Sequence, residues 1–210
     1  MIIVDNAVTE IAGQPVHAPV SFCLAARQLG ILTGGNGSGK TSLLRAILGE
    51  LDITSGSVQV CGKPVRVGQT WRLTRSVLRS IPQFPMQPET LTIAEYLRAW
   101  HLYRPSTSPD INLDHVTQEM EQITDHTSSA LLGTLSHGQQ RLVDILLSIR
   151  ARPRILLADE PLAGLSQHRS EWCVAQLTDF RRQGGALLVV AHKPEHQLWD
   201  ADWTQEVYPA

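Results

Sequence analysis

The sequence predicts an α/β fold with a mainly parallel sheet, an antiparallel β lobe and a small α-helical lobe. Strand-like and helix-like segments alternate along the chain, which is typical of α/β proteins. Two short apolar runs, residues 155–158 and 186–191, suit strands that are buried on both faces of a parallel sheet. Both runs end in polar residues, at the sheet edge where open α/β folds bind their ligands.

The antiparallel lobe is predicted from the first third of the chain. Residues 2–32 are rich in β-branched and small residues and are interrupted by glycine and proline, which indicates several short strands. Residues 55–67 alternate in polarity around residues 61–64, whose sequence Cys-Gly-Lys-Pro predicts the turn of a β-hairpin.

Three helical segments are predicted. Residues 41–48 form a short amphipathic helix, which Gly49 closes from the position of a C-terminal cap. Residues 93–103 and 118–123 also have helical composition. Between them, residues 105–109 are rich in proline and serine and predict a turn or loop.

Composition limits the class of protein. The length of 210 residues fits one domain, and 42% hydrophobic with 18% charged residues excludes both a disordered chain and an integral membrane protein. The sequence does not open with a secretory signal pattern, so we expect a cytosolic protein. A net charge of -2 without a long basic run argues against a nucleic-acid partner.

The three cysteines, Cys23, Cys61 and Cys173, are far apart in the sequence and lack CxxC spacing. Their odd number and wide separation argue against a disulfide framework and against a zinc site. We interpret all three as packing residues.

A glycine-rich loop is the strongest local signal, with the sequence Gly34-Gly35-Asn36-Gly37-Ser38-Gly39-Lys40-Thr41. It follows strand-like residues and opens a helix, which is the context of a phosphate-binding loop. Glycines let backbone N–H groups turn toward a phosphate, and the helix N-terminus adds partial positive charge. We expect Lys40 to reach the β and γ phosphates of ATP, Thr41 to hold Mg²⁺, and Ser42 to complete the nucleotide-binding set. The fold class is therefore a P-loop NTPase core.

Asp159 and Glu160 follow the apolar run at residues 155–158. An aspartate at such a strand end brings a carboxylate to Mg²⁺, and the adjacent glutamate can act as general base toward the attacking water. Two acids after a strand, taken alone, are more often a solvated strand end. Their pairing with the glycine-rich loop favours the catalytic interpretation.

Five sequence elements occur in a characteristic order, namely the glycine-rich loop, Gln83 in Ser80-Ile81-Pro82-Gln83, Leu135-Ser136-His137-Gly138-Gln139, Asp159-Glu160-Pro161, and His192 in Val189-Val190-Ala191-His192-Lys193. This order resembles the ATP-binding subunits of ATP-binding cassette (ABC) transporters, and the resemblance covers nearly the whole chain. The short length resembles compact bacterial cassettes such as those of haem exporters. We call residues 135–139 the signature sequence.

The resemblance implies roles for further residues. Gln83 would sense Mg²⁺ and the attacking water, and His192 would contact the γ phosphate, although an isolated glutamine or histidine is more often an ordinary polar residue. Ser136 and Gly138, with Gln139, would bind the γ phosphate of ATP held by a second chain. The implied assembly is a head-to-tail dimer, most simply a homodimer, that encloses two ATP molecules.

The resemblance also implies an organisation and partners. Residues 1–210 would form a single ABC ATPase domain, with residues 1–83 and 135–210 as catalytic core and β lobe, and 84–134 as helical lobe. A groove beside the helical lobe would receive a coupling helix of an integral membrane permease, placing the protein on the inner face of the cell membrane. Its candidate residues are Phe84, Met86 and Tyr96, for which buried packing is the alternative.

ATP-driven closure of the dimer would thus power transport through the permease. The alternatives are a soluble ABC ATPase that acts on ribosomes or DNA, and a regulatory ABC subunit. The sequence lacks the second cassette, basic extension or coiled-coil insertion of the first, and Glu160 and His192 argue against the second.

Four departures from the family pattern stand out. His137 replaces the second glycine of the signature sequence, Ser166 replaces an aspartate of the loop that crosses the dimer interface, and Leu147 stands where an arginine is frequent. Residues 11–17 lack the aromatic residue that stacks on adenine, which leaves Ile11, Val16 or His17 as substitutes with a weaker base contact.

Overall fold

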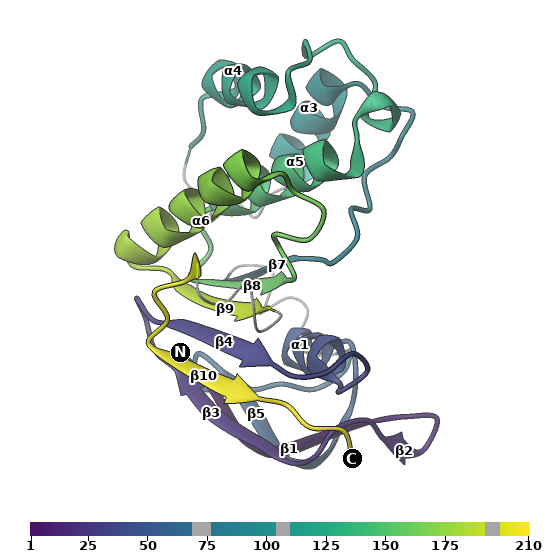
Figure 1. The fold of residues 1–210 in the computed structure, drawn as a ribbon, viewed down its shortest axis with the longest axis vertical. Coiled ribbons are helices and arrows are strands. Elements are labelled where there is room, and N and C mark those ends of the chain that lie inside the picture. The colour runs from purple at the N-terminus through teal and green to yellow at the C-terminus, as the bar shows by residue number, and fades with distance from the viewer. Residues whose placement is uncertain (69–76, 104–109, 192–197) are drawn as a thin grey trace.

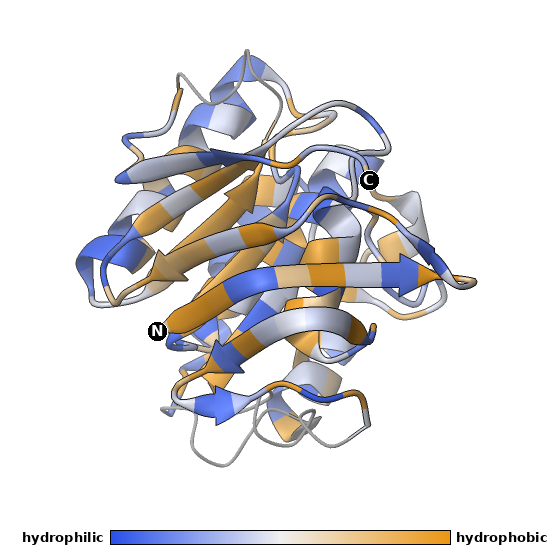
Figure 2. Ribbon diagram, turned by 90° about the horizontal axis from the view of Figure 1, so that it is seen from below, coloured by the Kyte–Doolittle hydropathy of each residue, from blue (hydrophilic) through white to orange (hydrophobic). Residues whose placement is uncertain are grey.

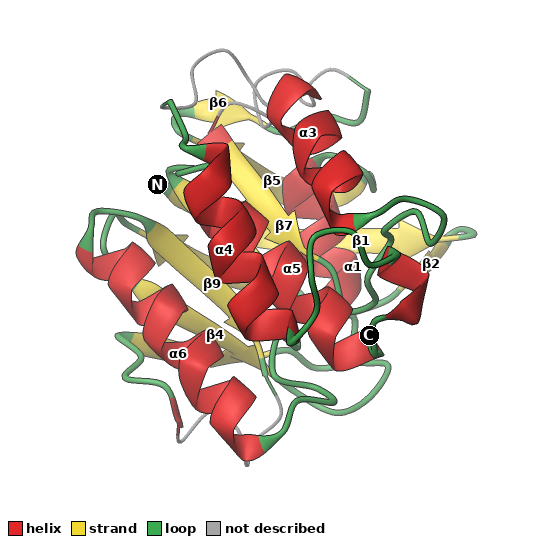
Figure 3. Cartoon of the chain, turned by 90° about the horizontal axis from the view of Figure 1, so that it is seen from above, coloured by secondary structure: helices red, strands yellow, loops and turns green. Residues whose placement is uncertain are grey.

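The computed structural model describes residues 1–68, 77–103, 110–191 and 198–210, which form layers of sheet and helix (Figure 1). Helices α5 and α6 cover one face of a parallel sheet, and α3 and α4 lie beyond them (Figures 1 and 3). Helix α1 and an antiparallel sheet cover the other face (Figure 1). The helices are α1 (Lys40–Leu48), α3 (Ile93–Tyr103), α4 (Leu113–Thr124), the 3-10 helix η1 (Leu132–Thr134), α5 (His137–Arg150) and α6 (Gln167–Arg182).

The parallel sheet has the strand order β10-β4-β9-β8-β7, and each described neighbouring pair in it is parallel. Its strands are β10 (Trp203–Glu206), β4 (Leu29–Thr33), β9 (Ala186–Val190), β8 (Ile155–Asp159) and β7 (Leu78–Ile81). Every residue of β4, β8 and β9 is buried, because helices or the second sheet cover both faces. The predicted mainly parallel sheet is confirmed, and its carboxyl edge carries the candidate site.

The antiparallel sheet has the order β2-β1-β5-β6, with β3 also paired to β1. Its strands are β1 (Ile2–Ile11), β2 (Gln14–Pro15), β3 (Val20–Leu24), β5 (Ile53–Val60) and β6 (Lys63–Pro64). Figure 2 shows hydrophobic and hydrophilic bands in turn along β1, as expected for a strand with one face on the core. The predicted antiparallel β lobe is confirmed.

The hairpin turn is tighter than predicted. Lys63 and Pro64 already belong to β6, so the turn consists of Cys61 and Gly62 alone. Both have left-handed backbone conformations, with φ values of 51° and 76°, as a two-residue hairpin turn of type I′ requires.

The three predicted helices are present: α3 has the predicted bounds, whereas α1 and α4 begin earlier than predicted. Helix α1 ends as predicted at Gly49, which caps it with φ 77°. Helix α4 begins earlier than predicted, because the side chain of Asn112 accepts a hydrogen bond from the His115 N–H and caps its first turn. Residues 105–109 lie outside the described residues.

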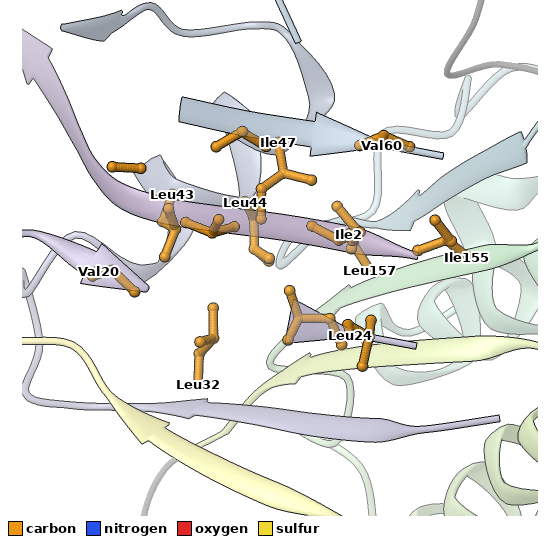
Figure 4. Close-up of a cluster of buried hydrophobic side chains, with 14 of the residues drawn as sticks. Ile2, Val20, Leu24, Leu32, Leu43, Leu44, Ile47, Val60, Ile155 and Leu157 are labelled. Atoms are coloured by element: carbon orange, nitrogen blue, oxygen red, sulfur yellow. The ribbon is translucent and has the colours of Figure 1, made fainter. Parts of the chain in front are cut away.

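Buried apolar side chains gather in three clusters. The first fills the space between the two sheets with side chains from α1, β8 and the antiparallel strands (Figure 4). The second lies between the parallel sheet, α5 and α6, and the third joins α3, α4, η1 and α5. Leu147 is 3% exposed within the third cluster, which explains an apolar residue at this position.

The packing interpretation of the cysteines holds for one of them. Cys173 is fully buried in α6, and its burial raises the thiol pKa to about 12. Cys23 lies on the outer face of β3 and Cys61 lies in the hairpin turn, and both are exposed. The interpretation as packing residues is therefore wrong for these two cysteines. Among the helices of the described ranges, none has both the length and the apolar content needed to cross a bilayer.

Candidate active site

The glycine-rich loop joins β4 to α1, and its backbone requires glycine at defined points. Gly34 and Gly39 have φ values of 146° and 90°. A Cβ at Gly39 would lie 2.8 Å from the His17 Cβ and 2.9 Å from the Val16 carbonyl oxygen, closer than real Cβ atoms approach. Gly39 also has no side chain to cap α1, and the first turn contains no acidic residue. The helix N-terminus therefore keeps its partial positive charge for an anion.

Lys40 directs its ammonium group into this loop. Its side-chain Nζ donates to the carbonyl oxygens of Gly34 and Gly35, at 3.0 and 2.8 Å. Only 6% of the residue is exposed, so the charge is held at the loop and not in solvent. This is the position from which a lysine can reach the β and γ phosphates of a bound nucleotide.

Thr41 and Asp159 meet across the site. The Thr41 hydroxyl donates to Asp159 Oδ2 at 2.8 Å, while the buried Oδ1 has no hydrogen-bond partner among the described residues. Burial raises the pKa of Asp159, opposed by the Thr41 hydrogen bond. A hydroxyl beside a carboxylate oxygen with free lone pairs fits Mg²⁺, which binds few protein oxygens and takes its other ligands from phosphate and water. The described residues contain no cluster of three acidic, histidine or cysteine side chains that would form a complete metal cage.

Gln83 and Glu160 form the second polar pair. The Gln83 side-chain Nε2 donates to Glu160 Oε2 at 2.9 Å, and the two residues follow the neighbouring strands β7 and β8. Glu160 has φ 47°, a left-handed conformation that costs a residue other than glycine about 1–3 kcal/mol. Such strain persists where the surrounding structure holds the residue in place.

A cavity of about 390 Å³ brings these groups together. It is lined by Ile11, Val16, Asn36, Gly37, Ser38, Gly39, Lys40, Thr41, Ser42, Gln83 and Glu160. The structure thus brings the glycine-rich loop, Glu160 and Gln83 together, as the sequence predicted. His192 lies outside the described residues.

The three residues expected to contact the base differ in their position. Ile11 and Val16 line the cavity with aliphatic side chains. His17 is fully buried, and its ring nitrogens lie 3.0 Å from the Thr9 hydroxyl and 2.8 Å from the Ala18 carbonyl oxygen. The expectation that His17 substitutes for a stacking residue is therefore wrong.

The signature sequence lies apart from this cavity, whose described lining includes none of its residues. Ser136 caps α5: its hydroxyl accepts from the Gln139 N–H at 3.3 Å, and Gln139 Oε1 accepts from the Ser136 N–H at 2.8 Å. The Gln139 side-chain Nε2 donates to the Thr124 carbonyl at 2.5 Å. A Cβ at Gly138 would lie 3.2 Å from the Gly164 carbonyl oxygen, so this glycine permits close packing of the first turn of α5 against the loop that contains Gly164.

Arg141 is the residue of the site that sequence reasoning missed. It is 6% exposed, and its guanidinium donates to the carbonyl oxygens of Glu160 and Gln83. Burial lowers the pKa of this guanidinium, while nearby acidic groups oppose the change. The sequence signal that could have identified Arg141 is its position on the apolar face of α5, one turn before Ile145 and two turns before Ile149. An arginine on such a face is expected to be buried.

Comparison with known proteins relates the chain to one family. Residues 17–163 match the family model described as ABC transporter. The Autoinducer 2 import ATP-binding protein LsrA of Enterobacter sp. (strain 638) is 30% identical over 88% of this chain, and the Arabinose import ATP-binding protein AraG of Pectobacterium atrosepticum is 28% identical over 89%. The chain spans 36% and 37% of the lengths of these two relatives.

Solved structures show the same fold. An ATP-binding subunit of an ABC transporter superposes with a TM-score of 0.85 at 20% identity, covering 99% of this chain and 86% of its own. A nucleotide-free ATP-binding cassette from an ABC transporter superposes with a TM-score of 0.79 at 19% identity, covering 99% of this chain and 87% of its own.

Proposed function

Because this chain belongs to the ABC transporter family, we propose that it binds ATP and hydrolyses it to ADP and phosphate, and that separate membrane permease subunits use this cycle for transport. One observation carries the proposal. Lys40, Thr41 and the Gln83–Glu160 pair line one cavity at the carboxyl edge of the parallel sheet, and Asp159 is joined to it through the Thr41 hydroxyl. Phosphoryl transfer needs these groups in this arrangement, because its catalysis is mostly positioning and charge stabilisation.

Each group has a defined task. Lys40 and the N–H groups of the loop neutralise charge on the phosphates, and Thr41 and Asp159 supply protein ligands for Mg²⁺. Mg²⁺ bound there would neutralise further phosphate charge. Glu160 accepts a proton from the attacking water. Gln83 orients the Glu160 carboxylate through its 2.9 Å hydrogen bond.

A second copy of the chain would complete each site. Ser136 and Gly138 lie at the exposed N-terminal end of α5 and outside the cavity of their own chain. In a head-to-tail dimer, this helix end would meet the γ phosphate held by the partner. The exposed His137 then lies at the same interface.

A surface beside Gln83 suits the permease. Phe84 and Met86 are 72% and 86% exposed, so the packing alternative is wrong for both. Tyr96 packs against the α3–α4–α5 cluster, and burial raises its pKa to about 12, so packing describes this residue. Two large apolar side chains next to the sensing glutamine favour docking of a permease segment, which would hold the protein at the inner face of the membrane.

Glu160→Gln tests the function. This change keeps shape and hydrogen-bonding reach but removes the proton acceptor, so ATP hydrolysis should fall by about 10²- to 10⁴-fold while ATP still binds. Trapped ATP should hold two chains together in size-exclusion chromatography with light scattering, and wild-type protein with ADP should stay monomeric.

Adding Ser136→Arg to Glu160→Gln is the matched control. The added side chain clashes only in the partner's site, so the dimer should be lost while nucleotide binding is kept. A Glu160→Gln protein that hydrolyses ATP at the wild-type rate refutes the catalytic assignment. One that stays monomeric at saturating ATP and high protein concentration refutes the two-chain site.

A further inference from the structure

Arg141 bridges the two backbones that carry the Gln83–Glu160 pair. Its guanidinium donates through one nitrogen to the Glu160 carbonyl and through the other to the Gln83 carbonyl. The Gln83 and Glu160 side chains also bond to each other, at 2.9 Å. The three residues therefore form a closed ring of hydrogen bonds, in which Arg141 is the member contributed by the helix of the signature sequence.

The Glu160 end of this ring needs external support. Glu160 has the left-handed φ of 47°, and its N–H donates to the Val190 carbonyl at 3.0 Å. Its carbonyl accepts from the Ala163 N–H at 3.1 Å as well as from Arg141. The direction of the carboxylate depends on this peptide, because a side chain follows the orientation of its own backbone.

The Gln83 end is joined to α5 at a second point. The Gln87 side-chain Nε2 donates to the Gln140 carbonyl and to Asp144 Oδ1, both at 2.7 Å. Residues 83–87 are thus attached to α5 at both ends, with the exposed Phe84 and Met86 between them.

Arg141 has no role in binding the nucleotide in its own chain. It does not line the cavity, and its partners are backbone carbonyls and not phosphate-facing groups. A buried guanidinium with two carbonyl acceptors is well suited to fix geometry, because its planar fork holds both acceptors at once.

We propose that Arg141 is a positioning residue for hydrolysis, which holds the backbones of Gln83 and Glu160 together. This role rests on the proposed ATPase function. It predicts that Arg141 affects the chemical step and not the affinity for ATP, because the groups that bind phosphate are attached elsewhere.

Arg141→Met and Arg141→Lys test the proposal, with Arg150→Met as control. Arg150 lies on the same helix and binds Glu119 through two nitrogens, away from the cavity. For Arg141→Met, kcat should fall by about 10- to 100-fold while the Kd for ATP changes less than about 3-fold, since small misplacements of reacting groups lower rates strongly. Arg141→Lys keeps the charge but loses the fork, so it should restore kcat only in part. Arg150→Met should keep the wild-type kcat.

Amide hydrogen exchange provides a readout that does not depend on activity. Arg141→Met should accelerate exchange of the Ala163 amide, which donates to the Glu160 carbonyl, and Arg150→Met should not. Wild-type protein that fails to hydrolyse ATP would overturn the proposed function, whereas the exchange result would still test the link between Arg141 and Glu160. Unchanged exchange at Ala163, an unchanged kcat, or a loss of ATP affinity equal to the loss of kcat overturns the proposal for Arg141.

Discussion

Asp144→Asn should change the pH dependence of stability, because the fold makes this carboxylate costly to ionise. Asp144 lies on α5 beside Arg141, and its Oδ1 accepts from the Gln87 side chain at 2.7 Å. Burial raises the pKa of Asp144 from 3.8 to about 6, although the Gln87 hydrogen bond and the Arg141 charge oppose this rise. Asparagine keeps the shape and an oxygen that can accept from Gln87.

The sign follows from proton binding. A raised pKa in the folded state means that the native protein binds more protons than the unfolded chain between about pH 4 and pH 6, so the unfolding free energy falls as pH rises through this window. A shift of about 2 pKa units corresponds to about 3 kcal/mol at about 1.4 kcal/mol per unit. Roughly 2 kcal/mol of this loss falls between about pH 4.5 and pH 7.5, since the unfolded aspartate is already mostly ionised at the lower value.

Urea unfolding of wild type and variant at these two pH values measures the effect. The unfolding free energy of Asp144→Asn minus that of wild type should be larger at the higher pH by roughly 2 kcal/mol. Asp179→Asn controls for the loss of a negative charge on a helix, because Asp179 is an exposed helical carboxylate that also accepts from a glutamine, at 2.6 Å from Gln183. Equal differences at both pH values for Asp144→Asn would refute the reasoning.

Three further changes test other parts of the structure. Lys40→Ala should abolish tight ATP binding in calorimetry, and unchanged affinity would exclude the loop as phosphate site. Val16→Tyr should increase the preference for ATP over GTP in competition binding, by up to about 1–3 kcal/mol from base stacking; an unchanged ratio would place the base elsewhere. Met120 is fully buried, so Met120→Ala should lower the unfolding free energy by about 2–5 kcal/mol. Leu102 is 78% exposed, so Leu102→Ala should change it by less than about 0.5 kcal/mol. Equal losses for the two variants would contradict the assigned core.

The parallel sheet and the phosphate loop could be predicted because their signals are local. Strands buried on both faces need runs of apolar residues, as in β9 and in β8 up to Ala158. The loop needs glycine where its backbone has positive φ or approaches another segment, as at Gly34 and Gly39. Both requirements can be recognised from the residue types of the segment itself, whichever distant part of the chain packs against it.

The parts that were missed depend on distant neighbours. Helix α6 was not predicted, because among its residues only Cys173, Leu177 and Phe180 are buried, which leaves a weak apolar stripe in the sequence. Arg141 was missed for a different reason. Its acceptors are the backbone carbonyls of Gln83 and Glu160, and a carbonyl is present at every residue, so no side-chain pattern marks the partner.

The register of the parallel sheet explains why Gln83 and Glu160 meet. Ile81 of β7 pairs with Ala158 of β8, so Gln83 and Glu160 each follow two residues after a matched pair. Parallel strands end at the same edge, and equal distances beyond a matched pair bring the two side chains to the same level, where they bond at 2.9 Å. A slip of one residue would turn the side chains of β7 to opposite faces and separate this pair. The register that pairs β7 with β8 therefore also aligns Gln83 and Glu160, and Arg141 preserves this alignment where the strands have ended.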